Sequence, residues 1–229
     1  MLACGMTTRV YLVRHGSTML SAEDRFAGAT DVELSDDGRA QASRLAERLA
    51  GVSLARVYAS PMKRTIATAT ILGAPHQQTP TPIDGLREID HGHWEGLTRA
   101  EVETKFPGEY ATWEKDPFTC APEGGEAGVR VMARALPAIH DMVDANLGKT
   151  ILVVSHKATI RLVLCALLGI DARGYRDRLD QDPACLNALD FKDAVHVRLA
   201  LFNDTSHYAS TPGLAAPGLS KWWALPAKA

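Results

Sequence analysis

The sequence predicts an α/β fold, a doubly wound and mostly parallel sheet with helices on both faces and a helical lid insertion. Short apolar runs rich in β-branched residues alternate with helical patterns, as is typical of parallel strands joined by helices. The run ILVVSH, at residues 151–156, begins with the continuous apolar stretch of a strand buried on both faces. With 46% hydrophobic residues, the 229-residue chain can bury a sizeable core. We expect one domain over residues 1–208, the lid at about 79–146 and an irregular tail at 209–229.

The N-terminal part of the chain opens with a strand and a helix. Residues 8–13 (TRVYLV) form the first expected strand, and a polar loop follows over residues 18–33. Ser35 is a suitable N-cap for a helix that ends near Gly51, because apolar residues recur at helical spacing between them. The other expected elements are strands at 55–61 and 151–156, helices at 62–73, 98–115, 128–146 and 158–169, and a final strand pair at 185–192 and 195–204.

Two local signals refine this assignment. Pro137 lies inside the expected helix at 128–146 and predicts a kink there, since proline cannot donate a helical hydrogen bond. The last two strands alternate in polarity and are expected to join through a tight turn near Asp193.

Composition excludes several classes of protein. The formal net charge is −2 and the sequence has no long Lys/Arg run, so a general nucleic-acid binder is disfavoured. No stretch approaches the roughly 18 apolar residues of a membrane helix. The four cysteines lie far apart with no C-x-x-C pair, which suits a reducing compartment. We expect a cytoplasmic protein with no nucleic-acid and no membrane partner.

Charged residues gather where the expected parallel strands end. LVRHG and VVSHK are apolar runs that stop at His15 and His156, and Arg64 lies in the first turn of the helix after a third strand. Ligands collect at the carboxyl ends of parallel strands, so these side chains should face one crevice together with Arg14. Guanidinium groups match phosphate oxygens, and the sequence therefore predicts a compact phosphate pocket.

Four motifs in order resemble the histidine phosphatase, or phosphoglycerate-mutase-like, superfamily. They are VRHG, SPMKRTIATA, LREIDHGHWEG and VVSH. The resemblance implies a phosphohistidine mechanism without metal or other cofactor, on a doubly wound α/β fold. It also implies roles for five residues: His15 is the nucleophile, Arg14, Arg64 and His156 hold the phosphoryl group, and Glu88 is the proton donor.

The residue types fit this chemistry. A neutral imidazole at His15 can attack phosphorus, while the two arginines and a protonated His156 neutralise the phosphoryl oxygens. Glu88 can protonate the leaving alkoxide and then act as base towards water. Asp90 and Glu95 lie nearby in sequence and are alternative proton donors.

The expected substrate-binding set departs from the mutase pattern. Ser17, Thr18 and Ser21 stand where mutase-like members usually carry Glu, Ser and Asn. Ser17 and Thr18 can still donate hydrogen bonds, and the loop that follows can offer the backbone N–H of Gly28. The complete expected set is Arg14, Ser17, Thr18, Ser21, Gly28, Arg64, His91, His156 and Lys157.

The acidic motif points to one branch of the family. REIDHGHWEG carries a histidine, His91, three residues after Glu88 and resembles the metal-independent phosphoserine phosphatases. We therefore expect a phosphatase for small phosphomonoesters, with phosphoserine or a similar carboxylated compound as substrate and His91 as the carboxylate ligand. The same branch suggests a homodimer. A phosphoglycerate mutase and a broad-specificity or sugar-phosphate phosphatase remain alternatives.

Two rival classes compete with the phosphatase. His91 and His93 have the spacing of a metal-binding pair, as in a metallohydrolase, although the sequence shows no further ligands nearby. A non-catalytic module could use the same cationic pocket to bind a phosphorylated partner. Retention of a nucleophile, two arginines, an acid and a second histidine favours the enzyme.

Overall fold

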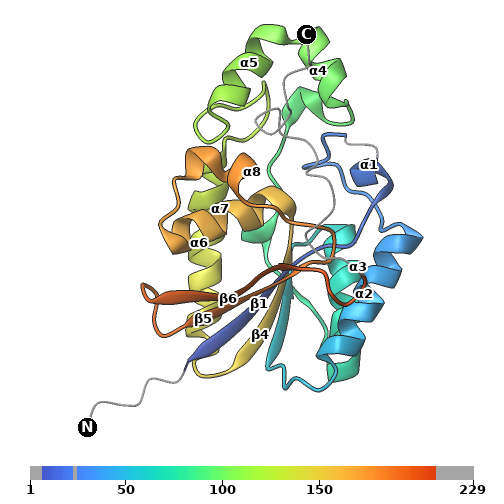
Figure 1. The fold of residues 1–229 in the computed structure, drawn as a ribbon, viewed down its shortest axis with the longest axis vertical. Helices are drawn as coiled ribbons and strands as arrows, with labels where there is room; N and C mark the ends of the chain where they lie inside the picture. Colours follow the sequence, from blue (N-terminus) through green and yellow to red (C-terminus); the bar gives the residue numbers. More distant parts are fainter. Residues whose placement is uncertain (1–6, 23–24, 210–229) are drawn as a thin grey trace.

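The computed structural model describes residues 7–22 and 25–209 and forms a six-stranded mixed sheet between helices (Figure 1). The strands are β1 (Thr8–Arg14), β2 (Arg56–Ala59), β3 (Thr81–Pro82), β4 (Thr150–Ser155), β5 (Leu186–Phe191) and β6 (Val197–Asp204). The helices are α1 (Met19–Ala22), α2 (Asp36–Leu49), α3 (Lys63–Gly73), α4 (Arg99–Lys105), α5 (Pro107–Lys115), α6 (Gly128–Asp144), α7 (Lys157–Leu168) and α8 (Tyr175–Arg178). Short 3-10 turns lie at η1 (Ala74–His76), η2 (Asp84–Leu86), η3 (Gly92–Trp94) and η4 (Ala172–Gly174).

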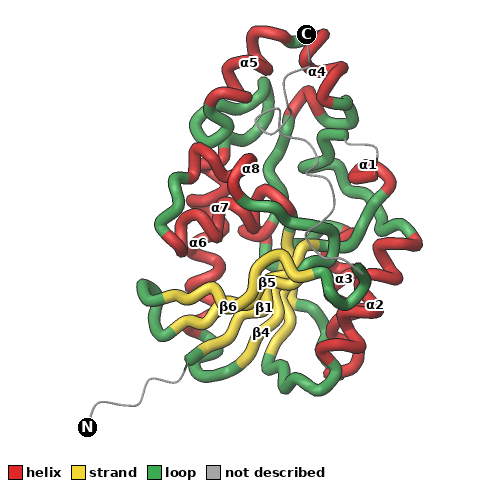
Figure 2. Tube along the Cα trace, viewed as in Figure 1, coloured by secondary structure: helices red, strands yellow, loops and turns green. Residues whose placement is uncertain are grey.

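The sheet has the strand order β3-β2-β4-β1-β5-β6, with both β1 and β2 parallel to β4. The last two strands are antiparallel, β5 to β1 and β6 to β5, so the expected C-terminal strand pair is present. Figure 2 shows the strands side by side between two groups of helices. This is the mostly parallel α/β architecture that the sequence predicts.

Helices cover both faces of the sheet. The apolar faces of α2 and α3 pack on one side, where Leu45 and Leu72 meet Val154 of β4. The helices α6 and α7 cover the other side, where Ile139 and Ile160 share a core with strand residues. Alternate residues of β4 thus reach two separate cores, which explains why its sequence is apolar without interruption.

Some elements differ from the sequence-based expectation. The single helix expected at 98–115 is two helices, because Phe106 precedes Pro107 and the residue before a proline is disfavoured in the helical region. The expected polar loop at 18–33 contains the short helix α1. By contrast, α6 runs through Pro137 without interruption.

Only part of the expected lid stands apart from the sheet. In α6, which the sequence assigns to the lid at 79–146, Val131, Ala135 and Ile139 pack into the main cores. The helices α4 and α5 lie at the far end of the molecule from the sheet, over a separate cluster of aromatic side chains around Trp94 and Trp113 (Figure 1).

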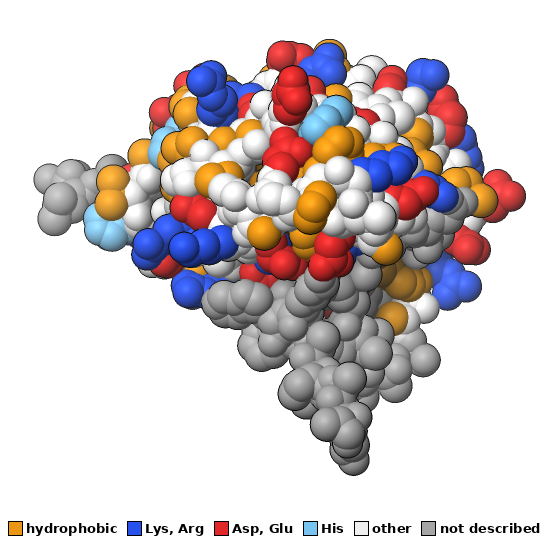
Figure 3. Space-filling model, turned by 90° about the horizontal axis from the view of Figure 1, so that it is seen from above, with side chains coloured by type: hydrophobic (Ala, Val, Ile, Leu, Met, Phe, Trp, Pro, Cys, Tyr) orange, Lys and Arg blue, Asp and Glu red, His pale blue; other side chains and the backbone are white. Residues whose placement is uncertain are grey.

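Two further expectations concern the ends and the surface. Of the expected irregular tail, residues 210–229 lie outside the described residues. Among the residues that the structure does describe, no helix is long and apolar enough to cross a membrane. The face in Figure 3 carries basic and acidic side chains interspersed, in keeping with the small net charge of −2.

Candidate active site

Three parallel strands deliver polar side chains to one edge of the sheet. His15 follows β1, Ser60 follows β2 and His156 follows β4, and these strands are neighbours. The backbone N–H groups of His15 and Ser60 both donate to carbonyl oxygens of β4, so the ladder continues to the site. The rings of His15 and His156 lie 5.2 Å apart between centroids, edge to face. The two histidines that the sequence places at strand ends therefore share one site.

Main-chain geometry selects the reactive nitrogen of His15. Its Nδ1 lies 2.7 Å from the carbonyl oxygen of Gly16. A carbonyl can only accept, so Nδ1 carries the proton and Nε2 keeps its lone pair. Burial, reinforced by the positive charges of Arg14 and Arg64, holds the pKa of His15 well below its usual 6.5. The ring is therefore a neutral imidazole with a free Nε2.

The second histidine is held by side chains. Arg64 Nε donates to His156 Nδ1 at 3.2 Å, and His156 Nε2 lies 2.7 Å from Ser60 Oγ. Because Nδ1 accepts, Nε2 carries the proton and donates to Ser60. Burial, followed by the charge of Arg64, holds the pKa of His156 well below 6.5. The ring is therefore neutral in this arrangement, and the protonated His156 expected during phosphoryl transfer stays a prediction.

The guanidinium of Arg64 is fixed by the loop before α2. Arg64 donates to the carbonyl oxygens of Thr30 at 2.7 Å and of Gly28 at 2.8 Å. The carboxylate of Glu95 in turn accepts from the N–H groups of Gly28, Ala29 and Thr30 and from the Thr30 hydroxyl. Glu95 thus orients a loop whose carbonyl oxygens orient Arg64. These contacts give Glu95 a structural task instead of the alternative proton-donor role.

Arg14 completes the cationic side of the site. It is 8% exposed, and its Nη1 donates to the carbonyl oxygen of Gln181 at 2.7 Å. Its Nε is buried without a hydrogen-bond partner among the described residues. Burial lowers the pKa of both Arg14 and Arg64, and the charge of Glu88 acts on each in the opposite sense. An anion entering beside them would meet donors that the protein leaves unsatisfied.

Glu88 lies at the N-terminus of α7, directly after His156. Its carboxylate accepts from the backbone N–H groups of Ala158 and Thr159, at 3.2 and 3.1 Å, and from the Thr159 hydroxyl. His156, the N-cap residue, makes no side-chain capping bond, so Glu88 caps this helix from another segment. The contacts hold an acid at the start of α7, the helix that follows His156 in the chain. Asp90, the other alternative donor, instead accepts from Gly92 N–H in its own loop.

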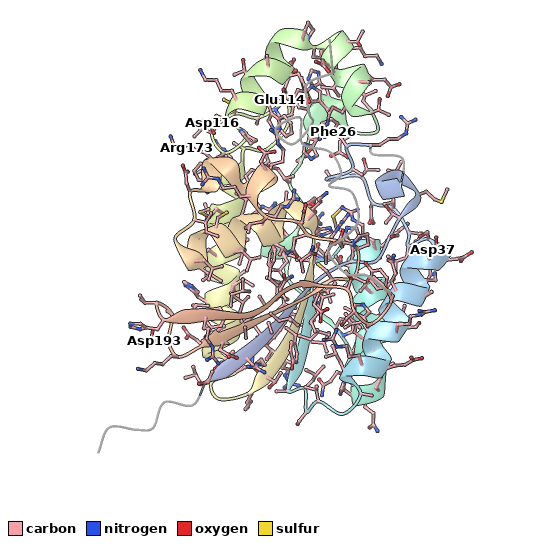
Figure 4. The ribbon with its side chains drawn as sticks, viewed as in Figure 1. Phe26, Asp37, Glu114, Asp116, Arg173 and Asp193 are labelled. Atoms are coloured by element: carbon pink, nitrogen blue, oxygen red, sulfur yellow. The ribbon has the colours of Figure 1, made fainter. Side chains whose placement is uncertain are left out.

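His91 directly precedes η3 and packs against the aromatic side chains of Phe26 and Trp113, a place that we call the aromatic region. Its ring packs 4.8 Å from Phe26 and 6.3 Å from Trp113, measured between centroids, and its Nδ1 is buried without a hydrogen-bond partner among the described residues. Figure 4 shows Phe26 below α4 and α5, near Glu114. Burial lowers the pKa of His91. A neutral ring here can donate one hydrogen bond to a ligand.

The proposed metal-binding pair gains no support from this geometry. His93 turns to Glu109, with Nε2 and Oε2 2.7 Å apart, and its ring packs 4.2 Å from Phe106. His91 has different neighbours, Phe26 and Trp113. No group of three or more His, Cys, Asp or Glu side chains within the described ranges is arranged to hold a metal ion.

The remaining expected substrate ligands fall into three groups. The N–H of Gly28 donates to Glu95 and its carbonyl accepts from Arg64, which differs from the expected N–H donation to substrate. The reason is that the Glu95 carboxylate lies 2.9 Å from this nitrogen and accepts its hydrogen bond. Ser17 and Thr18 lie in the segment between β1 and α1, after Gly16, and Lys157 is the first residue of α7. The side chain of Ser21 lies outside the described part.

Sequence reasoning missed Ser60 and the role of Glu95. Ser60 follows β2 and precedes Pro61, so the rule that located His15 and His156 at strand ends also applies to it. The task of Glu95 depends on the fold of a loop 65 to 67 residues away in sequence, and no local pattern signals it. Strand-end positions are therefore readable from sequence, whereas loop-to-loop anchors are not.

The chain is similar to known proteins in both sequence and structure. Residues 10–205 match the family model of the histidine phosphatase superfamily (branch 1). Phosphoserine phosphatase 1 of Hydrogenobacter thermophilus is 34% identical over 163 residues, 71% of this chain and 77% of that protein. The glucosyl-3-phosphoglycerate phosphatase of Mycolicibacterium vanbaalenii is 37% identical over 170 residues, 71% of this chain and 75% of that protein. The structure of YhfR from Bacillus stearothermophilus superposes with a TM-score of 0.82 at 31% identity, covering 87% of this chain and 98% of that one.

Proposed function

We propose that this chain hydrolyses small phosphomonoesters through a phosphohistidine on His15, without a metal ion. The chain belongs to branch 1 of the histidine phosphatase superfamily and is a phosphoric monoester hydrolase. One observation carries this proposal. The Gly16 carbonyl holds His15 Nδ1–H, so the lone pair of Nε2 is free beside Arg14 and Arg64.

In the first step, His15 Nε2 attacks phosphorus and the bond from phosphorus to the ester oxygen breaks. The guanidinium groups of Arg14 and Arg64 neutralise charge on the three phosphoryl oxygens. The N–H of His156 that now donates to Ser60 is a further donor beside His15. Charged and polar donors held beside the nucleophile are the main contribution that a protein can make to this reaction.

Glu88 manages the proton. In the first step its carboxyl group gives a proton to the leaving alkoxide, so that the product is a neutral alcohol. In the second step the carboxylate takes a proton from water, which attacks phosphorus as the P–N bond breaks and inorganic phosphate forms.

For the substrate we propose a small phosphomonoester with a carboxylate, phosphoserine first, and a hydrogen bond from His91 to that carboxylate. The buried, unpartnered Nδ1 of His91 and its place three residues after Glu88 support this assignment. Two relatives carry the names phosphoserine phosphatase and glucosyl-3-phosphoglycerate phosphatase, and both named substrates have a carboxylate on the alcohol side of the ester. A mutase or a broad-specificity phosphatase would use the same phosphate pocket.

Hydrolysis of p-nitrophenyl phosphate in EDTA tests the class of enzyme. We expect full turnover in the presence of this chelator. Turnover that returns only on adding a divalent cation would overturn the metal-free mechanism, and a complete lack of turnover would favour a phosphate-binding module. Incubation with 3-phosphoglycerate then separates the branches, since efficient formation of 2-phosphoglycerate would identify a mutase.

Two further expectations from the sequence stay predictions. We propose a cytoplasmic homodimer, which cell fractionation and light scattering of the purified protein check. A monomer at micromolar concentration would contradict the dimer.

A further inference from the structure

The loop of residues 181–185, which leads into β5, contacts the phosphate site through its main chain. The carbonyl oxygen of Gln181 accepts from Arg14 Nη1 at 2.7 Å. The N–H of Ala184 donates to the carbonyl oxygen of His15 at 3.1 Å. The conformation of this one loop therefore affects both a phosphate ligand and the nucleophile.

A buried amide side chain, Asn187 of β5, holds this loop. Its Oδ1 accepts from Gln181 Nε2 at 3.0 Å and from the N–H of Asn203 at 2.9 Å. Its Nδ2 donates to Gln181 Oε1 at 2.8 Å and to the carbonyl oxygen of Leu12 at 3.0 Å. Both N–H groups and both lone pairs of the Asn187 amide thus have partners. A buried polar network that is fully satisfied specifies one geometry.

A second contact ties the loop to β6. Asn203 Oδ1 accepts from the N–H of Asp182 at 2.7 Å, and Asn203 Nδ2 donates to Asp182 Oδ2 at 2.9 Å. Asn203 has a φ of 47°, and the pairing of β5 with β6 changes register next to Asn187. Such irregularities redirect groups away from the regular ladder. Here the N–H of Asn203 meets the Asn187 side chain, so Asn187 joins the loop, β1 and β6.

We propose that Asn187 is a positioning residue of the phosphate site, which orients the Arg14 guanidinium by fixing the loop of residues 181–185. This role rests on the proposed phosphatase function and deepens it. Asn187 acts through Gln181, whose carbonyl oxygen holds Arg14 Nη1, while Arg14 Nε is buried without a hydrogen-bond partner among the described residues. Because every phosphomonoester carries the phosphoryl group that Arg14 binds, the effect of Asn187 does not depend on the alcohol part.

Binding of inorganic phosphate measures this role without turnover. Asn187→Leu removes every polar atom of the side chain and releases the loop. We expect the Kd for phosphate, measured by isothermal titration calorimetry, to rise roughly 10-fold, about the value of one hydrogen bond to a charged group. The KM values for p-nitrophenyl phosphate and phosphoserine should rise in parallel. A merely structural role would instead lower the number of binding sites per chain and kcat, because part of the protein unfolds, and would leave Kd unchanged.

Asn146→Leu is the matched control. Asn146 is also a buried amide, at 4% exposure, and its Nδ2 donates to the hydroxyl of Tyr58 at 2.9 Å and to the carbonyl oxygen of Met142 at 2.8 Å. It lies before β4, whereas the site lies at the other end of that strand, after Ser155. We expect Asn146→Leu to lower the melting temperature as Asn187→Leu does and to leave the Kd for phosphate unchanged. An equal rise of Kd in both variants would overturn the positioning role.

A second variant keeps the test decisive. Gln181→Met retains the main-chain carbonyl that binds Arg14 and removes both amide bonds to Asn187, so the Kd for phosphate should rise roughly 3-fold. This variant decides if circular dichroism shows that Asn187→Leu does not fold, and an unchanged Kd would then contradict the role. If the wild-type protein binds phosphate but does not hydrolyse p-nitrophenyl phosphate, the proposed function fails and the Kd comparison still decides on Asn187.

Discussion

The two histidines at the sheet edge, His15 and His156, differ from His91 in the aromatic region in what holds their rings. His15 is bound through Nδ1 to a main-chain carbonyl, and His156 is bound on both nitrogens, by Arg64 and Ser60. The ring of His91 instead packs against Phe26 and Trp113, and its Nδ1 has no partner among the described residues. At the sheet edge, hydrogen bonds fix which ring nitrogen carries the proton. In the aromatic region, packing against other rings positions His91.

The difference has a physical consequence for catalysis and specificity. Nucleophilic attack needs one nitrogen with a free lone pair, and backbone bonds supply this without rearrangement. Recognition of the alcohol part needs donors that remain available, and a buried donor without a partner costs about 1–3 kcal/mol until a ligand satisfies it. We expect substitutions at the sheet edge to lower kcat/KM for all substrates, and the substitution of His91 in the aromatic region to lower it for carboxylated substrates.

Glu88 lies where the two regions meet, and its substitution should have the largest substrate-dependent effect. Glu88→Gln should slow hydrolysis of phosphoserine by roughly 10²- to 10⁴-fold, the usual contribution of general acid catalysis. p-Nitrophenyl phosphate has a better leaving group and should lose much less. Steady-state kinetics on both substrates measures the difference. An equal loss would show that Glu88 only caps α7, and would return Asp90 to consideration as donor.

A substitution of His91 tests whether the aromatic region recognises the carboxylate of the substrate. His91→Ala should lower kcat/KM for phosphoserine by about 1.5–3 kcal/mol, roughly 10- to 150-fold, if the ring donates one bond to the carboxylate. Phosphoethanolamine, which lacks the carboxylate, should be nearly indifferent. His93→Ala is the matched control, since His93 pairs with Glu109 and should leave the ratio of the two substrates as it is. A uniform loss on both substrates would make His91 a packing residue.

Glu95 sharpens the comparison from the sheet side. Glu95→Ala removes the acceptor that orders residues 28–30, whose carbonyls position Arg64, and we expect roughly a 10-fold rise in KM for every phosphomonoester, about the value of one charged hydrogen bond. Inhibition by inorganic phosphate should weaken in parallel. Glu33→Ala, at a side chain that is 61% exposed, is the control. A change confined to carboxylated substrates would contradict this positioning role.

The pH profile gives the smallest effect. Burial and two arginines lower the pKa of His15, so its neutral form persists below the usual 6.5. The acid limb of kcat/KM for p-nitrophenyl phosphate, which reports the free enzyme, should therefore lie below pH 6.5. An acid limb at or above that pH would show that the nucleophile is not desolvated as the structure indicates.

Much of the fold and of the sheet edge was predictable from the sequence, for a physical reason. Strand ends at His15 and His156 are local signals, and the topology rule for parallel strands then brings them together. The protonation state of His156 was not predictable, because it depends on burial beside Arg64 in the folded protein. The family resemblance supplied the roles, which the residues alone did not determine.

The structure around the aromatic region was harder to predict from the sequence. The break between α4 and α5 has a local signal, since Pro107 follows Phe106, but the helical pattern across it was stronger. The anchoring of residues 28–30 by Glu95 and the contact of Arg161 with Asp180 join segments distant in sequence. Such contacts follow from the packing of loops and have no periodic pattern in the chain.

Trapping the covalent intermediate tests the central claim most directly. A brief reaction of the enzyme with phosphoserine that carries a radiolabelled phosphoryl group, quenched in alkali, should leave a base-stable, acid-labile phosphoryl group on His15. Because Gly16 occupies the Nδ1–H, the phosphoryl group should be attached to Nε2, and peptide mapping with NMR distinguishes the two isomers. His15→Ala should give no adduct, while His196→Ala, at a side chain that is 72% exposed, should label normally. Label on a serine or cysteine, or on Nδ1 of His15, would contradict the account.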